Sequence, residues 1–494
     1  MDQSATRVST AGTGEPPLSE SEKNTIIAGV LLSMLLAALD QAIVAPAMPT
    51  IGEALGDAKY LPWIVTGYLL TATAVAPLYG KISDVRGRRV TLYAAILIFL
   101  AGSLVSAVAP SMLVLIIGRS IQGIGGGGLF ALTQTVIGDL VPPRERARYA
   151  AWISGTWAVA SVAGPLLGGY FAQHLNWSLI FWINLPLGAV AMVIINHPLK
   201  KLAIPNKQHG IDGWGALLLI VATALLLLAL NWAGSTFPWL SPEILGLLAV
   251  SALFWCGFAA RLITAREPLV TLEILRNKVI LAGTVTMFFA QAVNVGMAVY
   301  LPIYLQSSLG LSASQSGTAL LGLLLGTVAG AMTSGKIIPH FTHYRRIAVL
   351  GSLVSMASLF VLGFIAHGAS LAFVEVLTTL SGIGLGAVFP VMTVSVQNAV
   401  TRANLGVATG VLTFLRSLGG ALGVALLGTV ALSYGLPLGG EAAPLSAGSQ
   451  TAAPFAMVFL TSAVLSVITF VLILAMPEKP LRSRFDDEAP VMAE

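Results

Sequence analysis

Long apolar runs separated by short polar stretches organise the chain from one end to the other. An α-helix needs about 20 apolar residues to cross the roughly 30 Å of hydrocarbon in a bilayer. Fourteen runs of this kind start near residues 25, 61, 90, 112, 147, 179, 213, 242, 278, 316, 345, 370, 404 and 456. The pattern therefore predicts an all-α integral membrane protein with fourteen transmembrane helices.

The Lys and Arg residues indicate how these spans are oriented. If the N-terminus lies in the cytoplasm, only Lys59 falls in an outer loop, and only Arg119 and Arg416 fall inside spans. The other 23 of the 26 cations are then cytoplasmic, and one missed helix would destroy this asymmetry. We expect a multi-pass protein of the cell membrane, with a bacterial inner membrane favoured and with both termini cytoplasmic.

Composition supports a membrane protein and excludes other classes. The chain has 494 residues, of which 56% are hydrophobic and 10% charged, whereas soluble domains carry about a quarter charged residues. The net charge of +5 does not indicate a nucleic-acid partner, because the cations lie in short loops. The first 24 residues lack the apolar region of a signal peptide. The single cysteine, Cys256, excludes a disulfide framework and is interpreted as a small core residue.

Three short motifs occur twice in the same order. The copies are "YGKISDVRGRRV" at 79–90 with "SGKIIPHFTHYRRIAV" at 334–349, "QGIGGGGLF" at 122–130 with "SGIGLGAVF" at 381–389, and "GTWAVASVAGPLLGG" at 155–169 with "GVLTFLRSLGGALGV" at 410–424. The offsets between matching glycines are nearly constant: 335 − 80 = 255, 382 − 123 = 259 and 410 − 155 = 255. Repetition at one spacing indicates two similar halves.

The repeat predicts the domain organisation. Both copies have the same sidedness, as expected for two pseudo-symmetric six-helix halves related by an axis along the membrane normal, with substrate bound between them. Spans 7 and 8 belong to neither half and form an inserted helix pair. The predicted limits are an N-terminal tail at 1–24, a first half at 25–200, a linker with the inserted pair at 201–277, a second half at 278–476 and a C-terminal tail at 477–494.

Several motifs resemble those of a known family. "GKISDVRGRR" resembles the loop signature of the major facilitator superfamily, "RSIQGIGGGGLF" the span-4 motif of its proton-coupled members, and "AGPLLGG" the span-5 motif of its antiporters. "LDQAIVAPAMP" at 39–49 and "FWINLPLG" at 181–188 are similar to the fourteen-span drug:proton antiporter branch. The resemblance implies transport of a small amphiphilic substrate, with protons as the coupling ion and no other cofactor.

The loop signature carries one carboxylate, Asp84, among several cations. The cations can be interpreted equally as a topological anchor. Asp84 differs, because a carboxylate can accept hydrogen bonds from the free N–H groups at a helix N-terminus. The resemblance implies that it docks on the opposite half, here the start of span 13 near Asn404, and locks the inner gate. The expected gate latch comprises Gly80, Lys81, Asp84, Arg88 and Arg89.

Asp40, Arg119, Glu375 and Arg416 lie inside predicted spans, each about 8 to 12 Å from a span end. Ionisable groups in the bilayer are costly and mark ion or substrate pathways by default. One alternative is a pair of structural salt bridges. We favour proton coupling, because a carboxylate beside Arg stays ionised whereas a desolvated carboxylate without a cation takes up a proton. Asp40, with Arg119 as its partner, is the first choice; Glu375 and Arg416 come second.

Small and polar residues complete the candidate sites. The "GIGGGG" run is interpreted as a face that lets helices approach closely, and the glycines and proline of "AGPLLGG", Gly164, Pro165, Gly168 and Gly169, as a bent or thinned part of span 5. The histidines show no ligand spacing, so no metal site is expected. Candidates for the substrate cavity are Gln122, Phe130, Trp157, Gln291 and Asn294, although each is more often a packing residue.

The leading hypothesis is proton-coupled efflux of amphiphilic drugs or toxic compounds by alternating access, by a monomer that contacts membrane lipid and no nucleic acid. A proton-driven lipid or glycolipid exporter is the alternative. A peptide symporter is disfavoured, because span 1 lacks the acid-acid-Arg cluster of that group. A sensor or scaffold would not need four charges in the membrane, and no convergence of nucleophile, acid and base indicates an enzyme.

Overall fold

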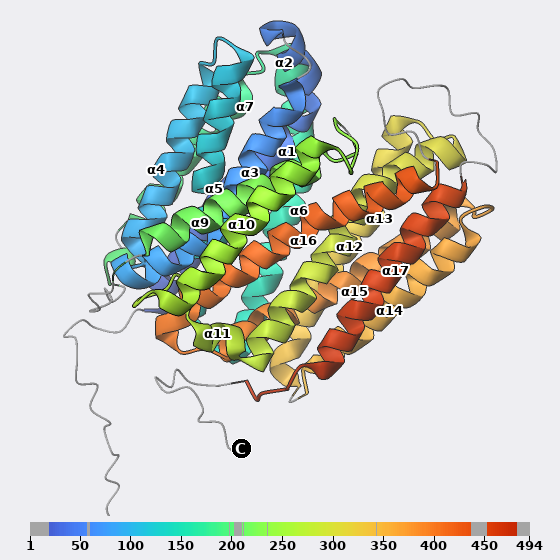
Figure 1. The fold of residues 1–494 in the computed structure, drawn as a ribbon. Coiled ribbons are helices and arrows are strands. Elements are labelled where there is room, and N and C mark those ends of the chain that lie inside the picture. Colours follow the sequence, from blue (N-terminus) through green and yellow to red (C-terminus); the bar gives the residue numbers. More distant parts are fainter. Residues whose placement is uncertain are drawn as a thin grey trace, which may run out of the picture.

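The computed structural model describes residues 19–56, 60–196, 198–201, 210, 212–234, 236–341, 343–435 and 452–481. Within these residues, fourteen helical segments are long and apolar enough to cross a membrane, which confirms the predicted number of spans (Figure 1). Lys59, most of the two tails and most of the polar stretch before residue 210 lie outside the described residues.

The first half contains six spans. Span 1 is α1 (Glu20–Ile43), which continues through the short helix η1 (Ala45–Ala47) into α2 (Met48–Leu55). A capping box between Ser19 and Glu22 starts α1. The other spans are α3 (Leu61–Arg86), α4 (Arg88–Ala107), α5 (Met112–Leu140), α6 (Pro143–His174) and the consecutive pair α7 (Leu179–Trp182) and α8 (Asn184–Asn196).

The remaining helices follow in the predicted order. The inserted pair is α9 (Gly213–Trp232) and α10 (Pro242–Thr264), and the short α11 (Leu272–Arg276) leads into the second half. That half consists of α12 (Lys278–Leu309), α13 (Ala313–Ile337) with the short helix η4 (Ile338–His340), α14 (Arg345–Ile365), α15 (Leu371–Asn398), α16 (Leu405–Ser433) and α17 (Ala452–Ala475).

The two halves repeat one packing pattern. In the first half α3 and α4 pack on α5, and α1 packs on α6 and α8; in the second half α13 and α14 pack on α15, and α12 packs on α16 and α17. Between the halves, α3 packs on α16 and α6 packs on α13. We call these contacts the α3–α16 seam and the α6–α13 seam. The predicted two pseudo-symmetric halves are confirmed, whereas the residue limits assigned to each domain stay predictions.

The inserted pair packs against the α3–α16 seam. The helices α9 and α10 contact one another, and α9 also contacts both α3 and α16 (Figure 1). Leu219 and Leu227 of α9 share a buried apolar cluster with Phe414 and Leu418 of α16. This shared apolar cluster holds the inserted pair against the second half as well as the first.

Cys256 is exposed on α10, so its interpretation as a core residue is wrong. Only one side of α10 is needed for packing on α9, and the helix is apolar nearly all round. A uniformly apolar sequence carries no signal for which side faces protein and which side faces lipid.

The expected loop between spans 2 and 3 is helical except at one residue. Helix α3 runs to Arg86 and α4 starts at Arg88, which leaves only Gly87 between them. Gly87 has a φ of +89°, a conformation that favours glycine because it has no Cβ. Asp84 and Arg88 are therefore held on rigid helix ends rather than in a flexible loop.

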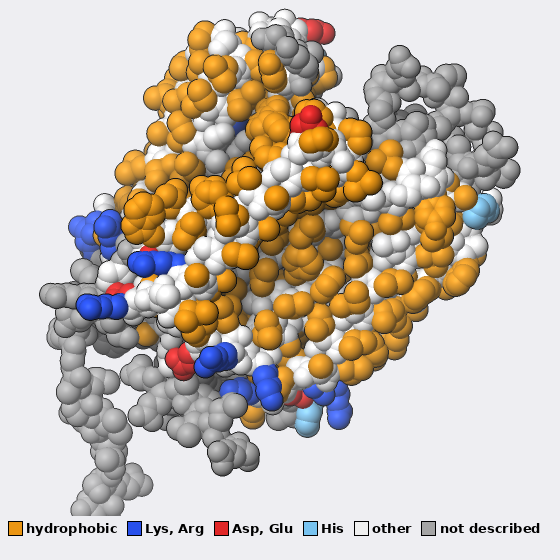
Figure 2. All heavy atoms as spheres, viewed as in Figure 1, with side chains coloured by type: hydrophobic (Ala, Val, Ile, Leu, Met, Phe, Trp, Pro, Cys, Tyr) orange, Lys and Arg blue, Asp and Glu red, His pale blue; other side chains and the backbone are white. Residues whose placement is uncertain are grey.

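Most of the described Lys and Arg side chains gather at one end of the molecule (Figure 2). This end, which we call the basic end, contains the C-terminal end of α3, the start of α4 and the α13–α14 connection. The two halves lie closer together here and diverge toward the opposite end (Figure 1). Hydrogen bonds from side chains to backbone join them at the basic end: Gln397 Nε2 donates to the Gln134 carbonyl at 3.4 Å, and Arg146 Nη1 donates to the Gln397 carbonyl at 3.4 Å.

Candidate functional site

A fully buried ion pair lies inside the first half. The Asp40 side chain near the end of α1 has no solvent exposure, and its ion-pair partner Arg119 of α5 is 1% exposed. The second carboxylate oxygen, Oδ1, accepts hydrogen bonds from Gln122 Nε2 at 3.0 Å and Asn184 Nδ2 at 2.8 Å. A charged carboxylate is tolerated at such a dry position because a cation and two amide donors surround it.

Arg119 has partners besides Asp40. Its Nε donates to the Ile64 carbonyl at 3.1 Å, and Nη1 also donates to Gln122 Oε1 at 2.9 Å. The guanidinium carbon lies 4.5 Å from the centre of the Tyr68 ring, within the range of a cation–π interaction. The guanidinium would thus keep a polar and aromatic shell if Asp40 became neutral.

Gln122, which was predicted to line the substrate cavity, lies beside the Asp40–Arg119 ion pair. Gln122 is fully buried, and its Nε2 donates to Ser103 Oγ at 2.7 Å in addition to Asp40. Both ends of its amide are occupied within the first half, so it orients the ion pair instead of facing a cavity.

Asn184 was missed as a site residue. The break between α7 and α8 places it at the first position of α8, where its amide donates to Asp40 and, at 3.2 Å, to Ser103. The available signal was a polar side chain inside the apolar run "FWINLPLG". A buried amide in a membrane needs hydrogen-bond partners, so an Asn in this run indicates a polar contact inside the first half.

The glycines of "AGPLLGG" bring α6 close to the end of α1. A Cβ added at Gly168 would lie 2.1 Å from the Ile43 carbonyl oxygen, and one added at Gly164 would lie 2.5 Å from the Ala42 Cβ. Ala42 and Ile43 follow Asp40 within one helical turn. These two glycines therefore set the helix spacing beside the ion pair, while Gly169 has no atom within 4 Å of an added Cβ.

Gly168→Ala is expected to lower the free energy of unfolding by about 1–3 kcal/mol, because backbone would have to move to admit the methyl group. The matched control is Gly169→Ala, which adds the same methyl group in open space and removes a helix-interior glycine. That control should be neutral or stabilising by up to about 1 kcal/mol. Thermal unfolding of the two purified variants measures the difference, and equal melting temperatures would contradict the close-approach interpretation.

The second half does not repeat the ion pair. Glu375 of α15 and Arg416 of α16 are each partly buried, and no ion pair between them occurs in the described part of the chain. A similar predicted depth along the membrane normal does not fix the direction in which a side chain points around its helix. Of the four ionisable residues expected inside spans, only Asp40 and Arg119 form an ion pair in the described structure.

Asp84 joins the two halves at the basic end. Its Oδ1 accepts from the Gly406 backbone N–H at 3.1 Å and its Oδ2 from the Val407 N–H at 2.9 Å. These N–H groups belong to the first turn of α16, where backbone donors lack partners within the helix. The expected contact with the start of span 13 is therefore present, two residues beyond Asn404.

Gly80 permits this contact. A Cβ added at Gly80 would lie 2.3 Å from the Gly406 carbonyl oxygen, so α3 and α16 touch through backbone at this point. Any larger residue at 80 would separate the helices and lengthen the Asp84 hydrogen bonds.

The cations of the expected latch behave differently from one another. Arg88 donates to Asp84 and Ser83, and its Nε donates to Asp139 of α5 at 2.6 Å. Arg89 points elsewhere, toward Asn196 at 3.2 Å.

Lys81 is partly exposed, with no hydrogen bond or ion pair among the described side chains. Among the described residues, no hydrogen bond or ion pair joins these cations to α16. Asp139 was not anticipated, although it is the acidic residue in the "GDL" that ends α5.

The other cavity candidates occupy both halves. Phe130 of α5 and Trp157 of α6 stack with ring centres 5.2 Å apart and planes 11° from parallel. On α12, Asn294 donates to Thr327 at 3.2 Å, and Gln291 lies one turn earlier and is partly exposed. Phe130 and Trp157 thus contact each other within the first half, whereas Gln291 and Asn294 share one helix of the second half.

The Major Facilitator Superfamily model matches residues 30–424. The chain is 32% identical to the multidrug transporter protein MdtP of Bacillus subtilis over 83% of this chain and 76% of that protein, and 32% identical to the efflux pump FUS6 of Gibberella moniliformis over 83% and 75%. Among solved structures it is similar to the human organic anion transporter MFSD10 (TM-score 0.64, 19% identity, 93% of this chain and all of that chain) and to the proton:xylose symporter XylE (TM-score 0.65, 16% identity, 94% and 98%). The chain is a transporter rather than an enzyme, and it belongs to the Major Facilitator Superfamily.

Proposed function

We propose that this protein exports small amphiphilic compounds from the cytoplasm in exchange for protons, as a monomer in the cell membrane. The observation that carries the proposal is the Asp40–Arg119 ion pair, which is buried in a span and surrounded by amide donors. The substrate class is taken from relatives named as multidrug transporters and efflux pumps.

The ion pair has the chemistry that proton coupling requires. In the described arrangement one cation and two amide donors contact the Asp40 carboxylate. A movement of α5 relative to α1 that separates Arg119 from Asp40 would leave a desolvated carboxylate, which takes up a proton. Arg119 would then rest on the Ile64 carbonyl and the Tyr68 ring. Proton uptake and helix movement are thereby linked.

The contact at the basic end supplies the gate in this proposal. The Lys and Arg residues of the basic end support a cytoplasmic location for it by the positive-inside rule. With Asp84 bound to the first turn of α16, the cytoplasmic side is closed and substrate leaves toward the opposite side. Release of Asp84 would allow the halves to rock apart at the basic end and admit the next substrate.

Transport tests this proposal most directly. Purified protein in liposomes with an imposed pH gradient is expected to move a fluorescent cationic dye against its concentration gradient, and collapse of the gradient should stop it. Movement of a fluorescent phospholipid in place of the dye would favour the alternative of lipid or glycolipid export. Dye movement unaffected by the pH gradient would contradict proton coupling.

The inserted pair is expected to lie outside the substrate pathway. It packs on the outer side of one seam, and its ionisable residues Asp212 and Arg261 bind each other near one helix end, with Nε–Oδ1 at 3.0 Å. A photoreactive substrate should therefore crosslink to α1, α5, α12 or α15 in preference to residues 216–230. Crosslinking mainly within 216–230 would place the pathway along the inserted pair instead.

A further inference from the structure

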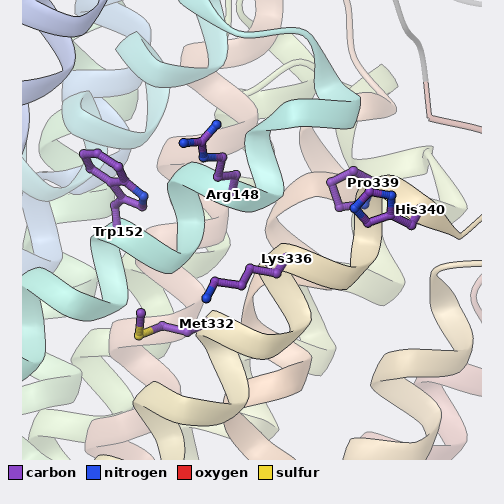
Figure 3. Close-up of a pocket in the computed structure, with 7 residues that line it drawn as sticks. Arg148, Trp152, Met332, Lys336, Pro339 and His340 are labelled. Carbon is purple, nitrogen blue, oxygen red and sulfur yellow. The ribbon is translucent and has the colours of Figure 1, made fainter.

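The α6–α13 seam contains an open groove at the basic end. It has a volume of about 510 Å³ and is lined by Arg148 and Trp152 from α6 and by Met332 and Lys336 from α13 (Figure 3). All four side chains are exposed, so no described helix covers the groove. Its size lies within the usual range for small-molecule sites.

The groove lies at the pseudo-symmetric equivalent of the α3–α16 seam, which α9 covers. By the internal pseudo-symmetry the α6–α13 seam corresponds to the α3–α16 seam, against which α9 packs. At the α3–α16 seam a carboxylate, Asp84, joins the halves through backbone donors. At the α6–α13 seam the first half offers Arg148 and the second half offers Lys336, so both sides present a cation. Two facing cations repel unless an anion lies between them.

The lining has two zones along the helix axes. Arg148 and Lys336, with His340 beyond, lie toward the basic end, and Trp152 and Met332 lie one turn further along α6 and α13 (Figure 3). The exposed apolar side chains then continue along the same helices, with Val159 and Leu166 on α6 and Leu321 and Leu325 on α13. A charged zone followed by a long apolar stripe matches a molecule with an anionic head and hydrocarbon chains. A small soluble anion has no hydrocarbon chains that could pack against the apolar stripe.

We propose that this groove binds an anionic phospholipid, whose phosphodiester lies between Arg148 and Lys336 and whose acyl chains follow the apolar stripe. Trp152 suits such a position, because tryptophan prefers the boundary between head groups and hydrocarbon. The bound lipid bridges the two halves and stabilises the arrangement in which they meet at the basic end. The lipid is thus a ligand that biases the conformational equilibrium, and it is distinct from a transported substrate.

Native mass spectrometry of the purified full chain, titrated with phosphatidylglycerol, tests the proposal. The double variant Arg148→Gln, Lys336→Gln should bind this lipid more weakly, by about fivefold for each cation and about 30-fold for both. The matched control is Arg86→Gln, Arg346→Gln. It removes one exposed cation from each half at the same end, away from the groove, and should leave the affinity within about twofold.

Further measurements distinguish a phospholipid from a soluble phosphate and show whether the variants fold. Phosphatidylcholine with the same chains should bind weakly to all variants, and glycerol 3-phosphate should not displace phosphatidylglycerol. Equal losses in both double variants would mean only general attraction to the basic end and would overturn the site. Tight binding of glycerol 3-phosphate alone would overturn the lipid assignment. Unchanged melting temperatures in phosphatidylcholine show that the variants fold.

Discussion

Asp40→Asn is expected to reduce proton-driven efflux to the level of protein-free vesicles. Asparagine cannot carry the proton, and its NH₂ group would face the guanidinium of Arg119. Breaking one side of a buried pair costs about 3–5 kcal/mol, because Arg119 would remain charged without its partner. Its contacts with the Ile64 carbonyl, Gln122 and Tyr68 offset part of that cost. Substrate-driven proton release from purified protein in weak buffer measures the coupling step itself.

Two further variants make this result interpretable. Asp40→Asn combined with Arg119→Gln removes the unpaired charge and should recover stability while proton release stays absent. Glu375→Gln removes the other acid inside a span, which has no ion-pair partner in the described structure, and should retain most of the release. Normal substrate-driven proton release from Asp40→Asn would refute the assignment of the proton site. Loss of release in Glu375→Gln alone would transfer that assignment to the second half.

Asp84→Asn is expected to depopulate the state that is closed at the basic end. The carboxylate accepts two backbone hydrogen bonds from α16, whereas an asparagine can accept with only one of its two terminal atoms. Loss of a charge-assisted contact of about 1.5 to 3 kcal/mol shifts a two-state equilibrium about ten- to hundredfold. The variant should still fold, because Arg88 keeps its ion pair with Asp139.

Spin-label distances across the basic end would measure this shift. Labels at the exposed positions Arg86 and Ala403 report on α3 and the start of α16, in a background where Cys256 is replaced by Ala. Lys81→Ala serves as the control, because a partly exposed cation without a described partner contributes little. If the cations were only a topological anchor, Lys81→Ala would lower insertion, and Asp84→Asn would leave both the distances and transport unchanged.

The sequence was sufficient to predict the number and order of the spans, because bilayer thickness fixes the length of a spanning helix. Internal repetition likewise predicted which helices are equivalent. The partner of Asp84 could be placed within two residues, because a helix start is recognisable in sequence and the motif implied contact with the opposite half. These predictions depend on position along the chain or along the membrane normal.

Predictions that needed the direction of a side chain around its helix were less successful. Gln122, Cys256 and the Glu375–Arg416 pair were each placed on a correct helix, but apolar residues surround these helices so evenly that no face was marked. The partner of Arg88 was missed for a related reason. Asp139 lies 51 residues away, and their contact exists only because α4 packs along α5.

The inserted pair has a mechanical consequence for a protein built from two similar halves. Since α9 packs more extensively on α3 than on α16, it should travel with the first half as one rigid body of eight spans against six. Rocking then requires α16 to slide past three helices, α3, α5 and α9, whereas α13 slides past α6. Resistance to sliding would therefore be greater at the α3–α16 seam than at the α6–α13 seam. The opening motion should pivot near the α3–α16 seam and be widest at the α6–α13 seam.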